Sequence, residues 1–222
     1  MRHFEQELDV LRTTLIRMAS LVDEQIDGGV RAILTSDVSL AKSVIAKDRE
    51  VDLYDNEIDH LCMRIFALTQ PVAVDLRLLM AALKINNELE RIGDIAVNLA
   101  ERAESLASFK KFVEKTSIEE MATGARSMVK NAIDAFVNSD ANLARTVLES
   151  DDSIDTLDAE NFHTMMETMK QSPDNVVPGS HVMMVSRHIE RLADHATNIA
   201  EDVIFIINAR IIKHHADEHN PG

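Results

Sequence analysis

Two segments of this chain occur twice, and this internal repeat constrains the fold more than any other feature of the sequence. Ser36-Asp37 followed by Leu40-Ala41 returns 103 residues later as Ser139-Asp140 followed by Leu143-Ala144. At the same offset, Asp48, Asp52, Asp55, Glu57 and His60 return as Asp151, Asp155, Asp158, Glu160 and His163. Such self-similarity predicts two copies of one structural unit.

A second motif repeats at an offset of 100 residues. Residues 90–101 and 190–201 share seven of twelve positions, which in the first copy are Glu90, Arg91, Asp94, Ala96, Asn98, Ala100 and Glu101. The repeat therefore extends over both halves of the chain, and we expect one unit at residues 1–110 and the other at residues 111–222.

The fold class follows from helical periodicity and from the scarcity of helix breakers. Among 222 residues there are only six glycines and four prolines, with no tryptophan and eleven methionines, a composition that favours long helices over turn-rich β structure. We therefore predict an all-α fold with six long helices, arranged as two tandem three-helix bundles related by internal duplication. The first three helices are expected at 3–34, 37–69 and 71–108.

The expected helix ends carry recognisable capping and stop residues. Ser36-Asp37 and Ser139-Asp140 can each cap the helix that follows, and Pro71 can open the third helix. Ser172-Pro173 through Pro178-Gly179 is expected to separate the last two helices. Gly28-Gly29 falls inside the first helix and is interpreted as a packing or kink feature. The bundles could pack side by side, end to end, or as one continuous six-helix array.

The charge balance excludes some partners. With 23 basic and 38 acidic residues, the formal charge of −15 disfavours binding to nucleic acid or to anionic lipid. It suits basic protein surfaces or cations, or it only maintains solubility. Cys62 is the only cysteine, so the chain cannot form an internal disulfide or a cysteine zinc cluster. Charges in the first thirty residues and the absence of an 18-residue apolar run predict a cytoplasmic protein that does not span a membrane.

Acidic residues form stripes on the expected helices. On a helical projection Asp48, Asp52, Asp55 and Asp59 lie within about 60° of one another, with apolar residues opposite, so this stripe is expected to face outward. Glu90, Asp94, Asn98 and Glu101 form a similar outward stripe on the next helix. Most such stripes are simply solvated. Here, however, like charges at i and i+4 repel, and the aspartate stripe of neither half has a lysine or arginine at the intervening i, i+4 positions to offset the repulsion.

We therefore predict that hard cations bind between neighbouring stripes, at open surface sites, through carboxylate and amide oxygens. The candidate ions are calcium, magnesium, manganese and iron, and the candidate ligands include Asn98 and its counterpart Asn198 beside the acids of the stripes.

One enzymatic alternative remains open. Glu57-x-x-His60 and Glu160-x-x-His163 have the spacing with which ferritin-like di-iron carboxylate oxidoreductases present two of their ligands. That site needs both motifs inside one bundle, whereas here each falls in a different bundle. The sequence contains no glycine-rich phosphate loop, His-Glu-x-x-His motif or nucleophile elbow, and we expect a protein without catalytic activity.

The chain resembles the PhoU family along essentially its whole length, and three motifs carry the resemblance. They are Gln70-Pro71-Val72-Ala73-x-Asp75-Leu76-Arg77, Glu88-Leu89-Glu90-Arg91-Ile92-Gly93-Asp94 and His188-Ile189-Glu190-Arg191-Leu192-Ala193-Asp194. The first motif has no clear counterpart before the last helix, and Ala193 replaces the family's frequent glycine. Partner contacts are therefore expected to be asymmetric, and metal occupancy of the second repeat is less certain.

The resemblance implies both a fold and a function. It implies paired three-helix bundles whose acidic motifs carry iron or other metals in some members, so iron is the leading candidate and manganese, magnesium, calcium and zinc are the alternatives. The positions that match these motifs are Asp48, Asp52, Glu90 and Asp94 in the first repeat and Asp151, Asp155, Glu190 and Asp194 in the second. It also implies a negative regulator of phosphate uptake and of the phosphate-starvation response, an adaptor between the ATPase subunit of a phosphate ABC transporter and a sensor histidine kinase. Such a protein would reach the membrane only through its partners, and a homodimer is possible. The residues expected to contact partners are Asp75, Arg77, Arg91 and Arg191.

Overall fold

Long helices make up nearly all of the chain in the computed structural model, which describes residues 2–69, 71 and 73–208. The elements are α1 (Arg2–Thr35), α2 (Val38–Leu68), α3 (Ala73–Leu106), α4 (Lys110–Val113), α5 (Ile118–Asn138), α6 (Ala141–Lys170), the 3-10 turn η1 (Pro173–Asn175) and α7 (Val176–Asn208). The described residues contain no strand, and the predicted all-α fold with six long helices is confirmed.

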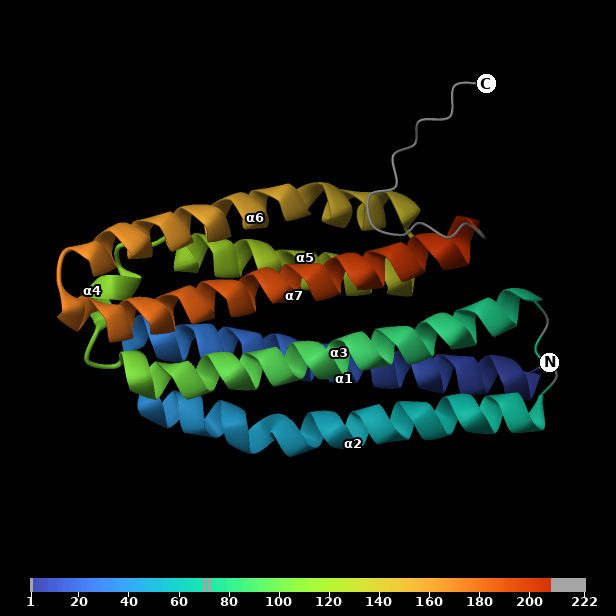
Figure 1. The fold of residues 1–222 in the computed structure, drawn as a ribbon. Coiled ribbons are helices and arrows are strands. Elements are labelled where there is room, and N and C mark those ends of the chain that lie inside the picture. Colours follow the sequence, from blue (N-terminus) through green and yellow to red (C-terminus); the bar gives the residue numbers. More distant parts are fainter. Residues whose placement is uncertain (1, 70, 72, 209–222) are drawn as a thin grey trace, which may run out of the picture.

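The two bundles lie side by side. Helices α1, α2 and α3 form one bundle and α5, α6 and α7 the other, with α2 and α6 on opposite outer sides and α3 next to α7 in the middle (Figure 1). The chain runs in opposite directions in α3 and α7. One hydrophobic core continues through both bundles and includes Leu89 and Ile92 of α3 as well as Ile189 and Leu192 of α7. The repeats therefore pack through a shared core.

The repeat is preserved at the turns that start α2 and α6. Ser36 and Ser139 have left-handed backbones, with φ of 57° and 53°. The aspartate that follows each serine caps the next helix: Asp37 accepts a hydrogen bond from Leu40 N at 2.9 Å, and Asp140 accepts one from Leu143 N at 3.0 Å. These caps satisfy backbone donors that the first helical turn leaves unpaired, as the sequence predicted.

Two local expectations need correction. The short helix α4 forms in the junction between the repeats, where no helix was expected. Pro178 and Gly179 do not separate two helices, because α7 already begins at Val176. Proline is tolerated there because the N–H groups of a first helical turn have no intrahelical partner. Gly179 leaves room for Met169, whose Cγ would lie 2.7 Å from a Cβ at this position.

The glycine pair in α1 is a packing feature. The helix continues through Gly28 and Gly29 without a break. A Cβ at Gly29 would lie 2.9 Å from the carbonyl oxygen of Ala96, which is closer than real Cβ atoms approach backbone. Gly29 therefore lets α1 and α3 pack backbone against backbone. Among the described residues, no helix is both long and apolar enough to cross a membrane.

Candidate metal-binding site: two acidic grooves

Opposed rows of carboxylates line the boundary between α2 and α3, which we call the first groove. Its acids are Asp48, Asp52, Asp55 and Asp59 of α2 with Glu90 and Asp94 of α3. Burial raises the pKa of Asp48, and the charges of Asp52 and Asp94 raise it further. The pKa of Glu90 is likewise raised, by burial and then by Asp94 and Asp55. The acids of the two helices therefore repel each other across the groove.

A buried asparagine fixes one end of the first groove. Asn86 of α3 is 0% exposed, and its Nδ2 donates to Asp55 Oδ1 at 2.7 Å and to Asp59 Oδ1 at 3.3 Å. Its own Oδ1 is buried and has no hydrogen-bond partner. Even with the hydrogen bond from Asn86, burial and the charge of Asp59 leave the pKa of Asp55 raised. Asn86 therefore holds two like charges together at the groove.

The corresponding acids of the second repeat form the second groove, between α6 and α7. They are Asp151, Asp155 and Asp158 of α6 with Glu190 and Asp194 of α7. Burial raises the pKa of Glu190 to about 7, with further contributions from Asp194, Asp158 and Asp155 that outweigh the opposing effect of Arg187. Glu190 Oε1 accepts a hydrogen bond from Arg187, while Oε2 is buried with no hydrogen-bond partner.

The structure corrects the expectation that all these acids face outward. Asp151 and Glu190 are only 9% and 6% exposed, because they face the neighbouring helix of the bundle instead of open solvent. The expectation of stripes without a cation is wrong for the second groove, where Arg187 forms an ion pair with Glu190. The i, i+3 spacing of Arg187 and Glu190 was an available signal for this ion pair, because side chains three residues apart are neighbours on a helix.

Asn198 also lies elsewhere than predicted. Its Nδ2 donates to Glu88 Oε2 of α3 at 3.1 Å, which places this amide at the boundary between the bundles and not with Glu190. Eight residues along a helix rotate the side chain by about 80°, enough to move it off the groove face. Its counterpart Asn98 is half-buried at the equivalent position of α3.

Sequence reasoning missed three buried polar residues at the grooves. Besides Asn86, they are Ser186, whose Oγ donates to Asp158 Oδ1 at 2.6 Å, and Asn161, whose Nδ2 donates to Ser186 Oγ at 3.1 Å. The available signal was positional: Asn86 and Ser186 stand at equivalent positions of the repeat, on faces that are otherwise apolar. Buried polar side chains need partners: Asn86 and Ser186 bond groove acids directly, whereas Asn161 bonds Ser186.

The donor set fits a hard cation. Carboxylate and amide oxygens are the ligands such ions prefer, and the buried, unpartnered Glu190 Oε2 is available to one. In the described part of the chain, no three His, Cys, Asp or Glu side chains already converge to hold an ion. Burial raises the pKa of Cys62 to about 12, with a further contribution from Asp59, so this thiol is protonated at neutral pH in the metal-free protein.

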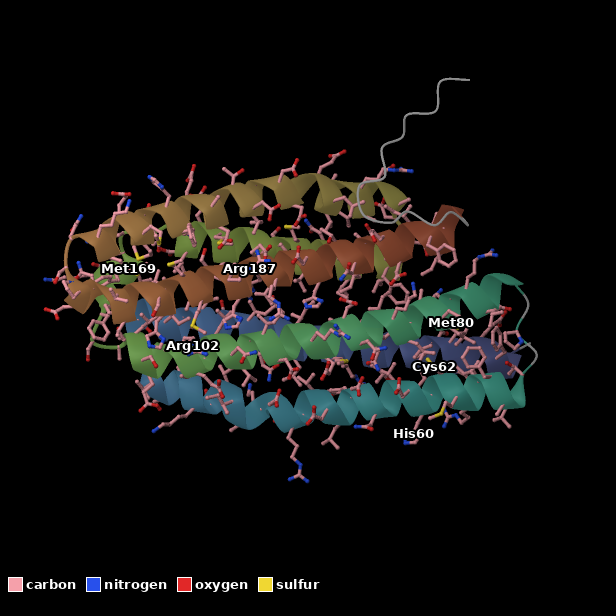
Figure 2. All side chains as sticks on the ribbon, viewed as in Figure 1. His60, Cys62, Met80, Arg102, Met169 and Arg187 are labelled. Atoms are coloured by element: carbon pink, nitrogen blue, oxygen red, sulfur yellow. The ribbon has the colours of Figure 1, made fainter. Side chains whose placement is uncertain are left out.

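The Glu-x-x-His motifs do not meet. Glu57 and His60 are exposed on α2, and Glu160 and His163 are exposed on α6. These helices form opposite outer sides of the molecule, and Figure 2 shows His60 on the outer side of α2. A di-iron site needs both motifs to point into one bundle, so the arrangement does not support the ferritin-like alternative.

The residues expected to contact partners lie on α3 and α7. Asp75 and Arg77 are half-buried near the start of α3, while Arg91 and Arg191 are exposed. Gln70 and Val72, from the same motif as Asp75, lie outside the described residues.

Comparisons with known proteins agree with this architecture. The chain matches the family model described as "PhoU domain" twice, at residues 15–103 and 118–203. It is 38% identical over 209 residues to a phosphate-specific transport system accessory protein PhoU homolog of Aquifex aeolicus, covering 94% of this chain and 95% of the relative.

Two solved structures share the fold. The crystal structure of PhoU from Pseudomonas aeruginosa superposes with a TM-score of 0.87 at 33% identity, covering 93% of this chain and all of that one. The phosphate transport system regulatory protein PhoU from Streptococcus pneumoniae has a TM-score of 0.86 at 23% identity, covering 95% of this chain and all of that one. Two family domains, the relative at 38% identity and the duplicated bundles together establish that the chain belongs to the PhoU family.

Proposed function

We propose that this protein is a non-catalytic accessory protein of phosphate transport, which binds hard cations in its two acidic grooves and regulates transport through protein contacts. The relatives' description as accessory proteins of a phosphate-specific transport system supports the transport assignment. The observation that carries the cation-binding part is the opposed carboxylates at equivalent positions of both repeats, which raise one another's pKa.

A bound cation would reduce the electrostatic repulsion between the carboxylates of each groove. Two like charges in a partly buried site repel more strongly than they would in water, because the effective dielectric constant is lower there. A bound iron, manganese, magnesium, calcium or zinc ion would offset this repulsion, and its ligands would be Asp48, Asp52, Glu90 and Asp94 in the first groove and Asp151, Asp155, Glu190 and Asp194 in the second. When bound, the ion supplies positive charge and links two helices of one bundle.

The proposed partners are the ATPase subunit of a phosphate ABC transporter and a sensor histidine kinase in the cytoplasm. Through them the protein would keep phosphate uptake and the starvation response low when phosphate is ample. Exposed Arg91 and Arg191 are the proposed contact residues, together with half-buried Asp75 and Arg77. A net charge of −15 favours basic partner surfaces.

Metal content tests the cation-binding part. We expect Asp94→Asn combined with Asp194→Asn to lower the iron or manganese that elemental analysis detects after metal loading and desalting, while circular dichroism stays unchanged. The matched control is Glu50→Gln combined with Asp152→Asn, which removes two exposed acids of α2 and α6 outside the defined grooves. Equal metal content in both double variants would exclude the grooves as the binding sites.

Pull-down of the two partners tests the adaptor part. Wild-type protein should retain the transporter ATPase or the kinase, and Arg91→Ala with Arg191→Ala should retain less. Deletion of the gene should switch on phosphate-starvation genes in rich phosphate. Retention of neither partner together with unchanged gene expression would refute the adaptor function.

A further inference from the structure

The two grooves differ in charge at two equivalent positions. Where the first groove has Asp59 of α2, the second has Phe162 of α6, and where α3 has Asn87, α7 has Arg187. The first groove thus holds six carboxylates and the second holds five. Both differences make the second groove less negative.

Arg187 lies at the mouth of the second groove. Its Nη1 donates to Glu190 Oε1 on the same helix and lies 3.9 Å from Asp158 Oδ2 on α6. One guanidinium therefore faces acids from both helices that line the groove, and Figure 2 labels Arg187 on α7. The Arg187 side chain is 61% exposed, whereas that of Glu190 is 8% exposed, so the guanidinium of Arg187 contacts the buried carboxylate of Glu190 from the solvent side.

The first groove has no equivalent cation. Asn87 is exposed, and its Nδ2 donates to the carbonyl oxygen of Leu83 on its own helix at 2.9 Å. Over residues 2–69, 71 and 73–208, no lysine, arginine or histidine forms an ion pair with an acid of the first groove. Arg91 lowers the pKa of Glu90, but burial and the charges of Asp94 and Asp55 each raise it by more.

We propose that Arg187 is a built-in cation of the second groove, so that the two grooves bind hard cations with unequal affinity. The first groove binds an ion directly, whereas an ion entering the second groove must first displace the guanidinium from Glu190 and Asp158. This inference rests on the proposed cation binding and adds an order of loading to it.

The exposure of Arg187 makes the displacement feasible. An arginine that is more than half exposed forms a weak ion pair, because water screens it and its long side chain loses rotamer freedom when paired. A divalent ion carries twice the charge and can bind several carboxylates at once. Arg187 therefore lowers the affinity of the second groove without closing it.

The test isolates each groove. Asp155→Asn with Asp194→Asn leaves only the first groove, and Asp52→Asn with Asp94→Asn leaves only the second. Each full-length protein is stripped with chelator and titrated with Mn²⁺ alone, with free Mn²⁺ measured by electron paramagnetic resonance. We expect the first groove to bind at least about tenfold more tightly, since one unit charge near the ion changes its binding energy by that order or more.

Exchange of the two residues then assigns the difference to Arg187. In the protein that retains only the second groove, Arg187→Asn should tighten Mn²⁺ binding by about tenfold. In the protein that retains only the first, Asn87→Arg should weaken it comparably. The matched control is Arg145→Asn, which removes the same charge from α6; within the described part of the chain the Arg145 side chain bonds only Asn142.

The possible outcomes separate the two proposals. Equal Mn²⁺ affinities in the two grooves, unchanged by Arg187→Asn, would overturn the inference and leave cation binding standing. An equal effect of Arg145→Asn would also overturn it, because the effect would then be one of net charge. No Mn²⁺ binding in either groove would overturn the proposed cation binding itself.

Discussion

The imidazole of His195 on α7 lies 2.6 Å from the carboxylate of Glu88 on α3, measured from Nδ1 to Oε2. Asn198 donates to the same oxygen, and both partners come from the opposite repeat. At the position equivalent to Glu88 stands His188, whose two ring nitrogens are buried without a hydrogen-bond partner. The contact between the repeats is therefore asymmetric: Glu88 is hydrogen-bonded to the opposite repeat, whereas His188 at the equivalent position is not.

Replacing Glu88 with methionine should destabilise the protein. The substitution keeps a side chain of similar volume but leaves His195 and Asn198 without their acceptor, which costs about 1–3 kcal/mol for buried donors. Urea unfolding followed by circular dichroism measures this loss. The control is His188→Met at the equivalent position, where no hydrogen bond is lost and we expect a change near zero or a gain. Equal losses in both variants would contradict the asymmetric contact between the repeats.

Gly29→Ala should be destabilising even though alanine is the better helix former. Alanine gains up to about 1 kcal/mol from propensity. Its Cβ, however, would press against the backbone oxygen of Ala96, which cannot move without shifting α3. We expect a net loss of about 1–3 kcal/mol in urea unfolding.

Gly93→Ala is the control for this prediction. Its Cβ would meet only side-chain atoms, Val51 Cγ1 at 3.3 Å and Gln25 Oε1 at 3.5 Å, and the second repeat already has alanine at the equivalent residue 193. Its stability should stay within about 1 kcal/mol of the unmodified protein. A greater loss in Gly93→Ala than in Gly29→Ala would refute the close approach of α1 and α3.

Arg126 forms a second polar link between the repeats. Its Nε and Nη2 donate to the two carboxylate oxygens of Asp23 at 2.6 and 2.9 Å, and its Nη1 donates to Asp27 at 2.5 Å. Lysine cannot reproduce this fork, so Arg126→Lys should lose about 1 kcal/mol at low salt. The loss should shrink in 1 M NaCl because these groups are partly exposed. Arg145→Lys should show no such salt dependence, because among the described residues the Arg145 side chain bonds the amide of Asn142 and no carboxylate.

The sequence predicted the helices well because their signals are local. Cap residues such as Asp37 and Asp140 act within one helical turn. Because the sequence is duplicated, the helix start that each of them marks was indicated twice. The prediction for Pro178 was wrong because a proline can either interrupt a helix or lie in its first turn, and the local sequence does not distinguish the two. In the structure α7 begins at Val176, so Pro178 lies in its first turn.

The candidate site was less predictable because it depends on how helices pack. The outward stripe was projected for Glu90 and its neighbours and was extended to Glu190 by the repeat, but packing against α6 buries Glu190. A one-helix projection contains the i, i+3 pair of Arg187 and Glu190, but it cannot show that Arg187 also faces Asp158 of α6 or that Asn198 bonds Glu88 on the other repeat. Contacts between residues more than a hundred positions apart depend on the angle between helices, which a one-helix projection does not contain.

Glu190 should make the stability of the metal-free protein fall as pH rises. Burial raises its pKa from 4.5 to about 7 in the folded protein, whereas the unfolded chain keeps the ordinary value. Between these pH values the folded state binds more protons than the unfolded state, so the free energy of unfolding decreases with rising pH. The stability that protonated Glu190 contributes is fully present below pH 4.5 and is lost as pH rises through about 7. The total loss in the free energy of unfolding is about 3 kcal/mol.

The glutamine side chain in Glu190→Gln cannot ionise, so the free energy of unfolding of this variant should lack the decrease that Glu190 causes. In chelator-containing buffer, urea unfolding at pH 5 and pH 8 should therefore give a stability difference between Glu190→Gln and the unmodified protein that grows with pH. The control is Glu90→Gln at the equivalent position. Its pKa is also raised by burial, but Glu90 is less buried, so the difference should grow less. A pH-independent difference for Glu190→Gln would show that residue 190 is ionised in the folded protein throughout this range, and that the second groove tolerates its full charge without a bound cation.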